Sequence, residues 1–157
     1  MLSVFIVFLT RALLVILFLP FSALDKILNL KTALRQASDV FSVRLIAILI
    51  IFGGFGLEVV MSLAILTGIV DRLAAFILAG YCIVTAMLWK QFWRKRDFRL
   101  KGKSQGRELF WDFLKNLAIA GGFLLLAFGT DPEGVQRFLA NPLSSSHPYT
   151  LIDQKGA

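Results

Sequence analysis

Four long apolar runs divide this chain of 157 residues, and they constrain its fold more than any other feature. The runs are Leu2–Leu24, Arg44–Gly68, Arg72–Trp89 and Leu109–Gly129. A helix needs about 17 to 25 apolar residues to cross a membrane core about 30 Å thick, and each run is that long. Hydrophobic residues make up 57% of the chain, against about 45–50% in soluble domains. We therefore expect an all-α fold, an integral membrane four-helix bundle.

Basic residues gather in two connectors, 25–43 and 90–107, and the net charge is +7. They are Lys26, Lys31 and Arg35 in the first connector, and Lys90, Arg94, Lys95, Arg96, Arg99, Lys101, Lys103 and Arg107 in the second. Cytoplasmic loops carry such an excess of Lys and Arg. We expect both connectors on the cytoplasmic side of a bacterial or archaeal inner membrane, with both termini outside. Charges confined to helix ends and loops do not favour a nucleic-acid partner.

The connector after the first run has its own pattern. Apolar residues with basic flanks recur at helical spacing, and they are Leu24, Ile27, Leu28, Leu30, Lys31, Leu34 and Arg35. This pattern predicts a short amphipathic interfacial helix whose Lys and Arg side chains contact anionic membrane lipids.

Two further expectations concern the ends of the chain. Residues 12–23 read alternatively as the apolar part of a cleaved signal peptide, but the segment before Arg11 is apolar instead of basic, which favours a retained span. Residues 1–130 then form one membrane domain. Residues 131–157 are rich in Pro and Ser and predict a flexible outer segment, with a short helix at Val135–Leu139.

Two opposite charges interrupt the apolar runs, Arg11 in the first and Glu58 in the second. A charge in hydrocarbon costs several kcal/mol, so such residues face a bundle interior and pair with one another. At about 1.5 Å per residue, Arg11, Glu58 and Cys82 share one depth. The sequence predicts an Arg11–Glu58 pair in one buried polar pocket, where the other members are Ser62, Tyr81, Cys82, Thr85 and Asn116. The alternative is a purely structural pair.

Cysteine and histidine are scarce. The single cysteine, Cys82, excludes an internal disulfide, so redox chemistry would need a partner or a cofactor. Because Cys82 lies in an apolar span, we interpret it as a small core residue and not as a nucleophile. The only histidine, His147, lies in the C-terminal segment, so we expect neither haem nor a metal ion.

These segments together resemble the DoxX family of small four-helix membrane proteins, which includes DoxD-like proteins. The resemblance covers about residues 5–130. It rests on Arg11-Ala12-Leu13-Leu14, Phe18 and Lys26, on Leu57-Glu58, Ala64, Leu66, Gly68 and Arg72-Leu73-Ala74-Ala75, and on Lys115-Asn116-Leu117-Ala118-Ile119-Ala120-Gly121-Gly122. The chain has Met61-Ser62 where relatives often carry a glycine pair, and Trp89-Lys90 where they often carry a histidine.

Relatives near the DoxD branch include a subunit of a thiosulfate:quinone oxidoreductase, and others are associated with thiol-redox and oxidative-stress complexes. The resemblance thus implies a membrane redox component that binds a quinone or handles a thiol or sulfur species. We expect Glu58 and Arg11 to carry the proton chemistry. Asn116, Tyr81 and Thr85 would bind a quinone carbonyl near Ser62, and Arg72 would attract an anionic substrate or serve as an interfacial anchor.

Whether the chain is an enzyme by itself stays open. The rival hypothesis is a non-catalytic membrane scaffold that docks a soluble oxidoreductase through its basic Lys90–Arg107 loop. A small transporter is disfavoured, because Pro20 is the only proline in a span and no internal repeat is visible. Self-association of the chain is a further open point.

Overall fold

The computed structural model describes residues 1–40 and 43–150, of which 39 and 40 through their backbone only. Every regular element within these ranges is a helix. The elements are α1 (Leu2–Val15), a π-helical turn η1 (Leu17–Ser22), α2 (Ala23–Leu28), α3 (Leu30–Val40), α4 (Arg44–Thr67), α5 (Asp71–Trp89), a short 3₁₀ turn η2 (Phe92–Arg94), α6 (Gln105–Phe128) and α7 (Pro132–Ala140). The predicted all-α fold is confirmed.

Four helical stretches within the described residues are long and apolar enough to cross a membrane. They are Leu2–Leu28, Arg44–Thr67, Asp71–Arg94 and Gln105–Phe128. The first stretch is a composite of α1, η1 and α2, and it runs a few residues past the predicted end of the first apolar run. The four predicted runs therefore correspond to the four long helical stretches.

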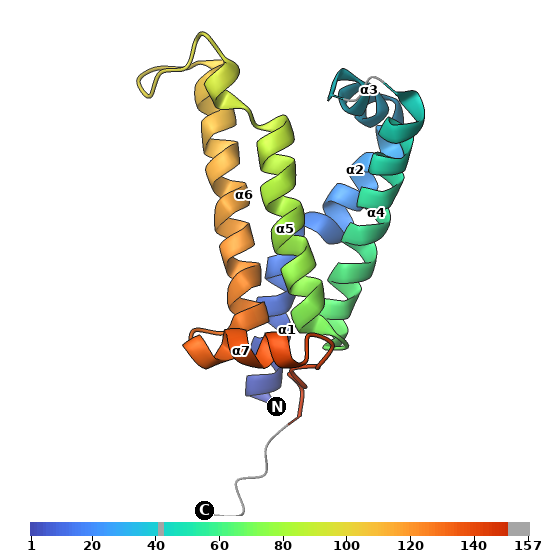
Figure 1. Cartoon of the computed structure of the whole chain (residues 1–157), viewed down its shortest axis with the longest axis vertical. Coiled ribbons are helices and arrows are strands. Elements are labelled where there is room, and N and C mark those ends of the chain that lie inside the picture. Colours follow the sequence, from blue (N-terminus) through green and yellow to red (C-terminus); the bar gives the residue numbers. More distant parts are fainter. Residues whose placement is uncertain (41–42, 151–157) are drawn as a thin grey trace, which may run out of the picture.

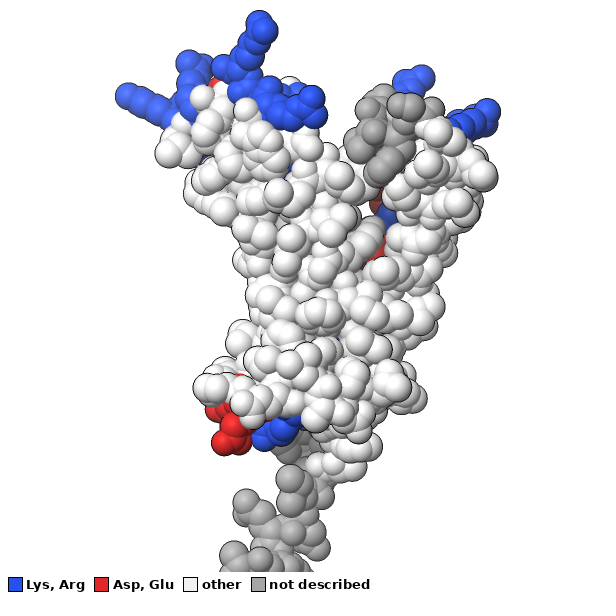
Figure 2. All heavy atoms as spheres, in the orientation of Figure 1, with Lys and Arg blue, Asp and Glu red and all other residues white. Residues whose placement is uncertain are grey.

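The helices form two arms that diverge toward one end of the molecule (Figure 1). One arm contains α5 and α6, the other contains α2, α3 and α4, and α1 meets both arms at the opposite end (Figure 1). We call the end with α3 and the α5–α6 connector the basic end, because Lys and Arg atoms gather there on both arms (Figure 2). The N-terminus and α7 lie at the other end, which we call the terminal end.

A kink separates α1 from α2. Leu19 has non-helical dihedral angles (φ −124°, ψ 110°), and Pro20 follows it within η1. Proline lacks the N–H that an intrahelical hydrogen bond needs, and its ring clashes with the preceding turn, so the helix bends here. The bend swings α2 away from the axis of α1 and onto α4. Pro20, which the sequence analysis treated as an isolated proline, therefore sets the course of the second arm.

Small residues allow the long helices to pack closely around one apolar core. The core centres on α5, which packs most extensively on α6. Its buried members are Val15, Phe18, Ile65, Ala74, Ala75, Leu78, Ala79, Cys82, Ala120, Phe123 and Ala127. Alanines make up much of this list, and small side chains are what lets apolar helices approach one another.

The chain after α6 folds back onto the terminal end. Helix α7 lies across this end (Figure 1), and its buried Phe138 packs against Phe76 of α5 and Phe128 of α6, with ring centroids 5.3 and 5.1 Å apart. The predicted helix at Val135–Leu139 is present and longer, from Pro132 to Ala140.

Candidate functional site

Glu58 is the centre of a cluster of polar side chains between the two arms. Its side chain is 3% exposed. Tyr81 of α5 donates a hydrogen bond to Glu58 Oε1 (2.6 Å). Ser22 Oγ donates to Oε2 (2.9 Å), and Lys26 Nζ lies 2.5 Å from the same oxygen. We call Ser22, Lys26, Glu58 and Tyr81 the Glu58 cluster. A carboxylate with three hydrogen-bond donors, one of which is a cation, is fully satisfied in this apolar setting.

Two local features of the sequence bring this cluster together. The bend in η1 turns α2 toward α4, and Ser22 and Lys26 lie one helical turn apart, so both face Glu58. Their own side chains are also hydrogen-bonded, Lys26 Nζ to Ser22 Oγ at 3.0 Å. On α4, a Cβ atom at Gly54 would lie 3.1 Å from Tyr81 Oη. Glycine at position 54 therefore makes room for the Tyr81 hydroxyl beside Glu58.

The predicted Arg11–Glu58 pair is wrong. Arg11 Nη2 lies 2.7 Å from Asp71 Oδ2, and Arg11 Nη1 donates to the Ile65 carbonyl at 2.8 Å. Ile65 is seven residues beyond Glu58, or about 10 Å along α4. The depth estimate failed because it aligned the outer ends of the helices. The start of α1 extends beyond the ends of α4 and α5 (Figure 1), so Arg11 reaches the terminal end.

The segment after α7 completes the surroundings of Arg11. Ser146 donates its backbone N–H to Asp71 Oδ1 (2.9 Å), and its hydroxyl donates to Asp71 Oδ2 and accepts from Arg11 Nη2 (2.8 Å). The Tyr149 hydroxyl donates to the Leu66 carbonyl. Where the sequence analysis predicted a flexible segment, residues 131–150 turn back and hydrogen-bond to the helix ends. The rest of that prediction, 151–157, lies outside the described residues.

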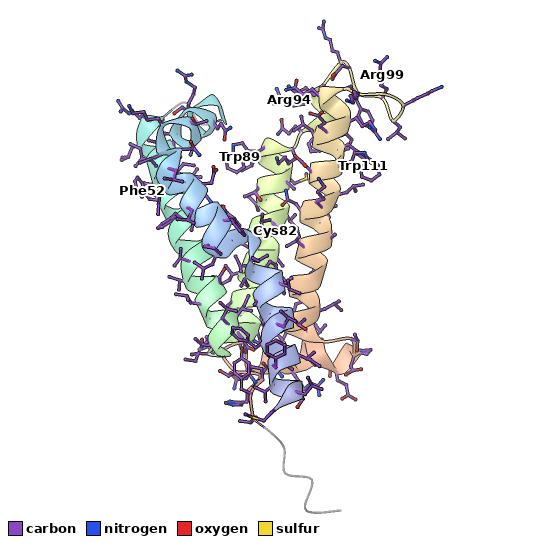
Figure 3. The ribbon with its side chains drawn as sticks, turned by 180° about the vertical axis from the view of Figure 1, so that it is seen from behind. Phe52, Cys82, Trp89, Arg94, Arg99 and Trp111 are labelled. Atoms are coloured by element: carbon purple, nitrogen blue, oxygen red, sulfur yellow. The ribbon has the colours of Figure 1, made fainter. Side chains whose placement is uncertain are left out.

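Two other predicted site residues lie near Glu58 without contributing a hydrogen bond to it. The Ser62 side chain is fully buried one turn from Glu58, and its hydroxyl has no hydrogen-bond partner among the described residues. The Thr85 hydroxyl donates within its own helix, to the carbonyls of Tyr81 (2.8 Å) and Cys82 (3.1 Å). Cys82 is buried on α5 between the arms, in the core (Figure 3).

The remaining two predicted site residues lie elsewhere. Arg72 is half-buried at the terminal end and donates to Ser144 Oγ at 3.3 Å. Asn116 is half-buried on α6 and lines a groove of about 700 Å³ between α6 and the end of α1. The groove's charged members are Lys90, Asp112 and Lys115. The prediction of one pocket that also contains Arg11 and Asn116 is therefore wrong.

A small pocket borders the Glu58 cluster on the arm of α2 and α4. It has a volume of about 240 Å³ and is lined by Lys26, Ile27, Leu30, Ile51, Phe52 and Phe55. We call it the Lys26 pocket. Lys26 is its one charged lining residue, and the exposed Ile27 and Phe52 are at its mouth. Phe52 points away from α5 and α6 (Figure 3), so the pocket opens on the outer side of this arm.

Two residues that matter here, Lys26 and Asp71, were not predicted as site residues. Lys26 was read as a loop charge that sets topology, although it lies at helical spacing from Ser22 and follows the only proline in a span. Asp71 was not assigned to a site, although it lies directly before the third apolar run. A search for every charge within reach of a kinked span could have found Lys26.

The α5–α6 connector at the basic end has a defined shape. The Asp97 carboxylate accepts the backbone N–H groups of Gln105 (2.8 Å) and Gly106 (3.2 Å), where α6 begins. Phe92 packs against the rings of Phe98 and Phe110 at centroid distances of 5.1 Å. Arg94 and Arg99 extend from this end of the molecule (Figure 3). The backbone of the connector is therefore held in place by these contacts, while most of its basic side chains are exposed.

The described residues contain no group of three or more His, Cys, Asp or Glu side chains that could hold a metal ion. Comparisons of the chain with protein-family models, curated proteins and solved structures find no match. The arrangement of the Glu58 cluster is therefore the basis for any functional conclusion.

Proposed function

We propose that this chain is an integral membrane protein of the DoxX type. In this proposal it is the quinone-binding subunit of a membrane-associated redox system for thiols or sulfur compounds. The observation that carries the proposal is Lys26, which lines an apolar pocket with its side chain and holds the buried Glu58 carboxylate with its ammonium group. A pocket with apolar walls and one convergent polar group is the usual form of a small-molecule site.

Membrane insertion is the first part of the proposal. The four long apolar stretches support it. The distribution of charge does so too, because the face shown in Figure 2 has few Lys, Arg, Asp and Glu atoms between the two ends. By the positive-inside rule the basic end is cytoplasmic. The terminal end, with both chain termini, is then outside, and α3 lies at the inner surface as an interfacial helix.

The Lys26 pocket suits the head group of a quinone. Its volume of about 240 Å³ is below the range of about 300–1,000 Å³ typical for whole drug-sized ligands. It has room for one substituted ring, and the rings of Phe52 and Phe55 provide aromatic surface for stacking. Because the pocket opens between exposed apolar side chains, an isoprenoid tail can continue from it into lipid.

The Glu58 cluster then supplies the proton chemistry. Reduction of a quinone to a quinol takes up two electrons and two protons. The electrons come from a thiol or reduced sulfur donor through a partner subunit, because the chain has a single, buried cysteine. Lys26 hydrogen-bonds the quinone carbonyl and donates a proton to the reduced oxygen. Glu58 holds the Lys26 charge, accepts protons from water and passes them to Lys26, so that this path delivers both protons of the quinol. Tyr81 positions Glu58 through its hydrogen bond.

The test uses membranes that contain the protein with its partners. We expect quinone reduction with thiosulfate or small thiols as donors, and a large loss of it in Glu58→Gln and Lys26→Met at equal amounts of folded protein. Arg72→Gln is the control, because Arg72 lies at the terminal end and should retain activity. Quinone reduction that is unchanged in both cluster variants would contradict the proposal.

A second candidate function is a scaffold that docks a soluble oxidoreductase, and the folded α5–α6 connector favours it. The connector holds Lys95, Arg96 and Arg99 on an exposed surface, which can attract an acidic partner. In that case replacing these three residues by Gln would release the partner. The Glu58→Gln variant would keep full activity, which distinguishes the two functions.

A further inference from the structure

A second pocket lies at the basic end, between α3 and the start of α4, and it shares no lining residue with the Lys26 pocket. Its volume is about 360 Å³, and it is lined by Lys31, Leu34, Arg35, Ser38, Arg44, Ala47 and Ile48. We call it the α3–α4 pocket. Among the lining residues whose side chains the structure describes, three are cations, one has a hydroxyl group and none is acidic. Neither the Glu58 cluster nor its proton chemistry uses any of these residues.

The two helices build this pocket from different edges. Lys31, Arg35 and Ser38 follow one another at helical spacing along α3, so they share one side of it. Ala37, on the side that packs against α4, is fully buried. Arg44 is the first residue of α4 and closes the pocket from the other helix. The pocket is therefore a rim of basic groups over a floor of Leu34, Ala47 and Ile48.

The start of α4 adds a second reason to expect an anion. Its N-cap residue is Val43, which has no side-chain acceptor for the first N–H groups of the helix, and the first turn contains no acidic residue. A helix N-terminus carries a partial positive charge and unsatisfied donors. Placing Arg44 there is unfavourable by itself. An anion in the pocket would satisfy the helix terminus and relieve the repulsion among the three cations.

The apolar surroundings distinguish a lipid from a free ion. The floor of the pocket is apolar, and it continues along α4 into exposed side chains, where Leu45, Ile46 and Leu49 are 64, 44 and 63% exposed. A free phosphate would use the rim alone. A phospholipid uses both parts, because its phosphate meets the cations and its acyl chains run along α4.

We propose that the α3–α4 pocket binds the head group of an anionic phospholipid of the cytoplasmic leaflet. The three basic side chains and the α4 N-terminus hold the phosphate, and the acyl chains lie against the exposed apolar surface of α4. This proposal rests on the membrane insertion proposed above, and it is independent of quinone chemistry.

The test measures thermal unfolding of the purified protein in an uncharged detergent, titrated with phosphatidylglycerol, with phosphatidylcholine or with inorganic phosphate. The pocket variant combines Lys31→Gln, Arg35→Gln and Arg44→Gln. The matched control combines Lys95→Gln, Arg96→Gln and Arg99→Gln, which removes the same charge from the α5–α6 connector. We expect phosphatidylglycerol to stabilise the wild type and the control. The pocket variant should need at least about tenfold more of it, since it has lost three charge contacts to the phosphate.

Three outcomes would overturn the proposal. They are equal stabilisation of the wild type and the pocket variant, an equal loss in the control, and full stabilisation of the wild type by inorganic phosphate or phosphatidylcholine. If the triple variant does not fold, the single variant Arg35→Gln on the exposed face of α3 takes its place, with the number of retained lipids counted by native mass spectrometry. Alkaline extraction of cell membranes tests insertion separately, so failure of the membrane assignment and failure of the lipid site give different results.

Discussion

The two buried ion pairs of this protein differ in what surrounds them. Arg11 and Asp71 have side chains that are 6 and 0% exposed, and their further partners include the Ile65 carbonyl and the backbone N–H of Ser146. Lys26 and Glu58 are 16 and 3% exposed, and their further partners are the side-chain hydroxyls of Ser22 and Tyr81. One pair is tied to the backbone, and the other is held by side chains alone.

This difference separates a structural role from a chemical one. Backbone partners fix the geometry of Arg11–Asp71 and join α1, α4, α5 and the C-terminal segment at the terminal end. Side-chain partners can reorient when a ligand arrives, and the Lys26–Glu58 pair borders a pocket. Disruption of the first pair should therefore cost stability, and disruption of the second should cost activity.

The largest stability effect is expected for Arg11→Leu. This change leaves the fully buried Asp71 without its cation, which typically costs about 3–5 kcal/mol. Unfolding of the purified protein in mixed detergent micelles, followed by circular dichroism, measures the change. Asp71→Asn combined with Arg11→Leu should recover part of the loss, because no unpaired charge then remains. A loss below about 1 kcal/mol for Arg11→Leu would contradict a structural role for this pair.

The largest effect on activity is expected for Glu58→Gln. Removal of a group that moves protons typically lowers a rate about 10²- to 10⁴-fold, and we expect at least the lower figure for quinone reduction per folded protein. The cost in stability should be smaller than for Arg11→Leu, because Lys26 is partly exposed and can turn toward its pocket. Glu108→Gln, on the exposed side of α6, is the charge-matched control and should keep its activity.

A smaller effect is expected for Gly54→Ala, which tests the Tyr81–Glu58 hydrogen bond without altering either residue. The new methyl group would lie 3.1 Å from Tyr81 Oη and displace the hydroxyl. Loss of a hydrogen bond to a charged group lowers the unfolding free energy by about 1.5–3 kcal/mol. The helix propensity of alanine offsets about 1 kcal/mol of this loss. Gly53→Ala is the control, because nothing lies within 4 Å of its added methyl group. Similar unfolding free energies for both variants would show that Tyr81 adds little.

The smallest effect is expected for Thr85→Val. Its hydroxyl is hydrogen-bonded to carbonyls of its own helix, which already have helical partners. We expect less than about 1 kcal/mol in unfolding free energy and unchanged quinone reduction, since such hydrogen bonds contribute little. A strong loss of activity would return Thr85 to the site that the sequence analysis proposed for it.

Much of the fold could be predicted because it follows from local pattern. Length and hydropathy locate the four long helices, and depth along two adjacent helices brings Glu58 and Tyr81 together. Partner choice could not be predicted in the same way. It depends on the bend at Pro20, which places Lys26 beside Glu58. It also depends on how far α1 extends beyond the ends of α4 and α5, which places Arg11 beside Asp71. The position of Ser146 depends on the course of the chain after α7, which no periodicity encodes.

The most direct test of the central claim is binding of a short-chain quinone to purified protein, measured by calorimetry for the wild type, Lys26→Met and Ser146→Ala. The account predicts that Lys26→Met weakens binding at least tenfold, because the pocket loses its only charged group. Ser146→Ala should bind as the wild type does, because Ser146 belongs to the Arg11–Asp71 pair. Equal binding by Lys26→Met and the wild type would contradict the assignment of the Glu58 cluster as the functional one of the two pairs.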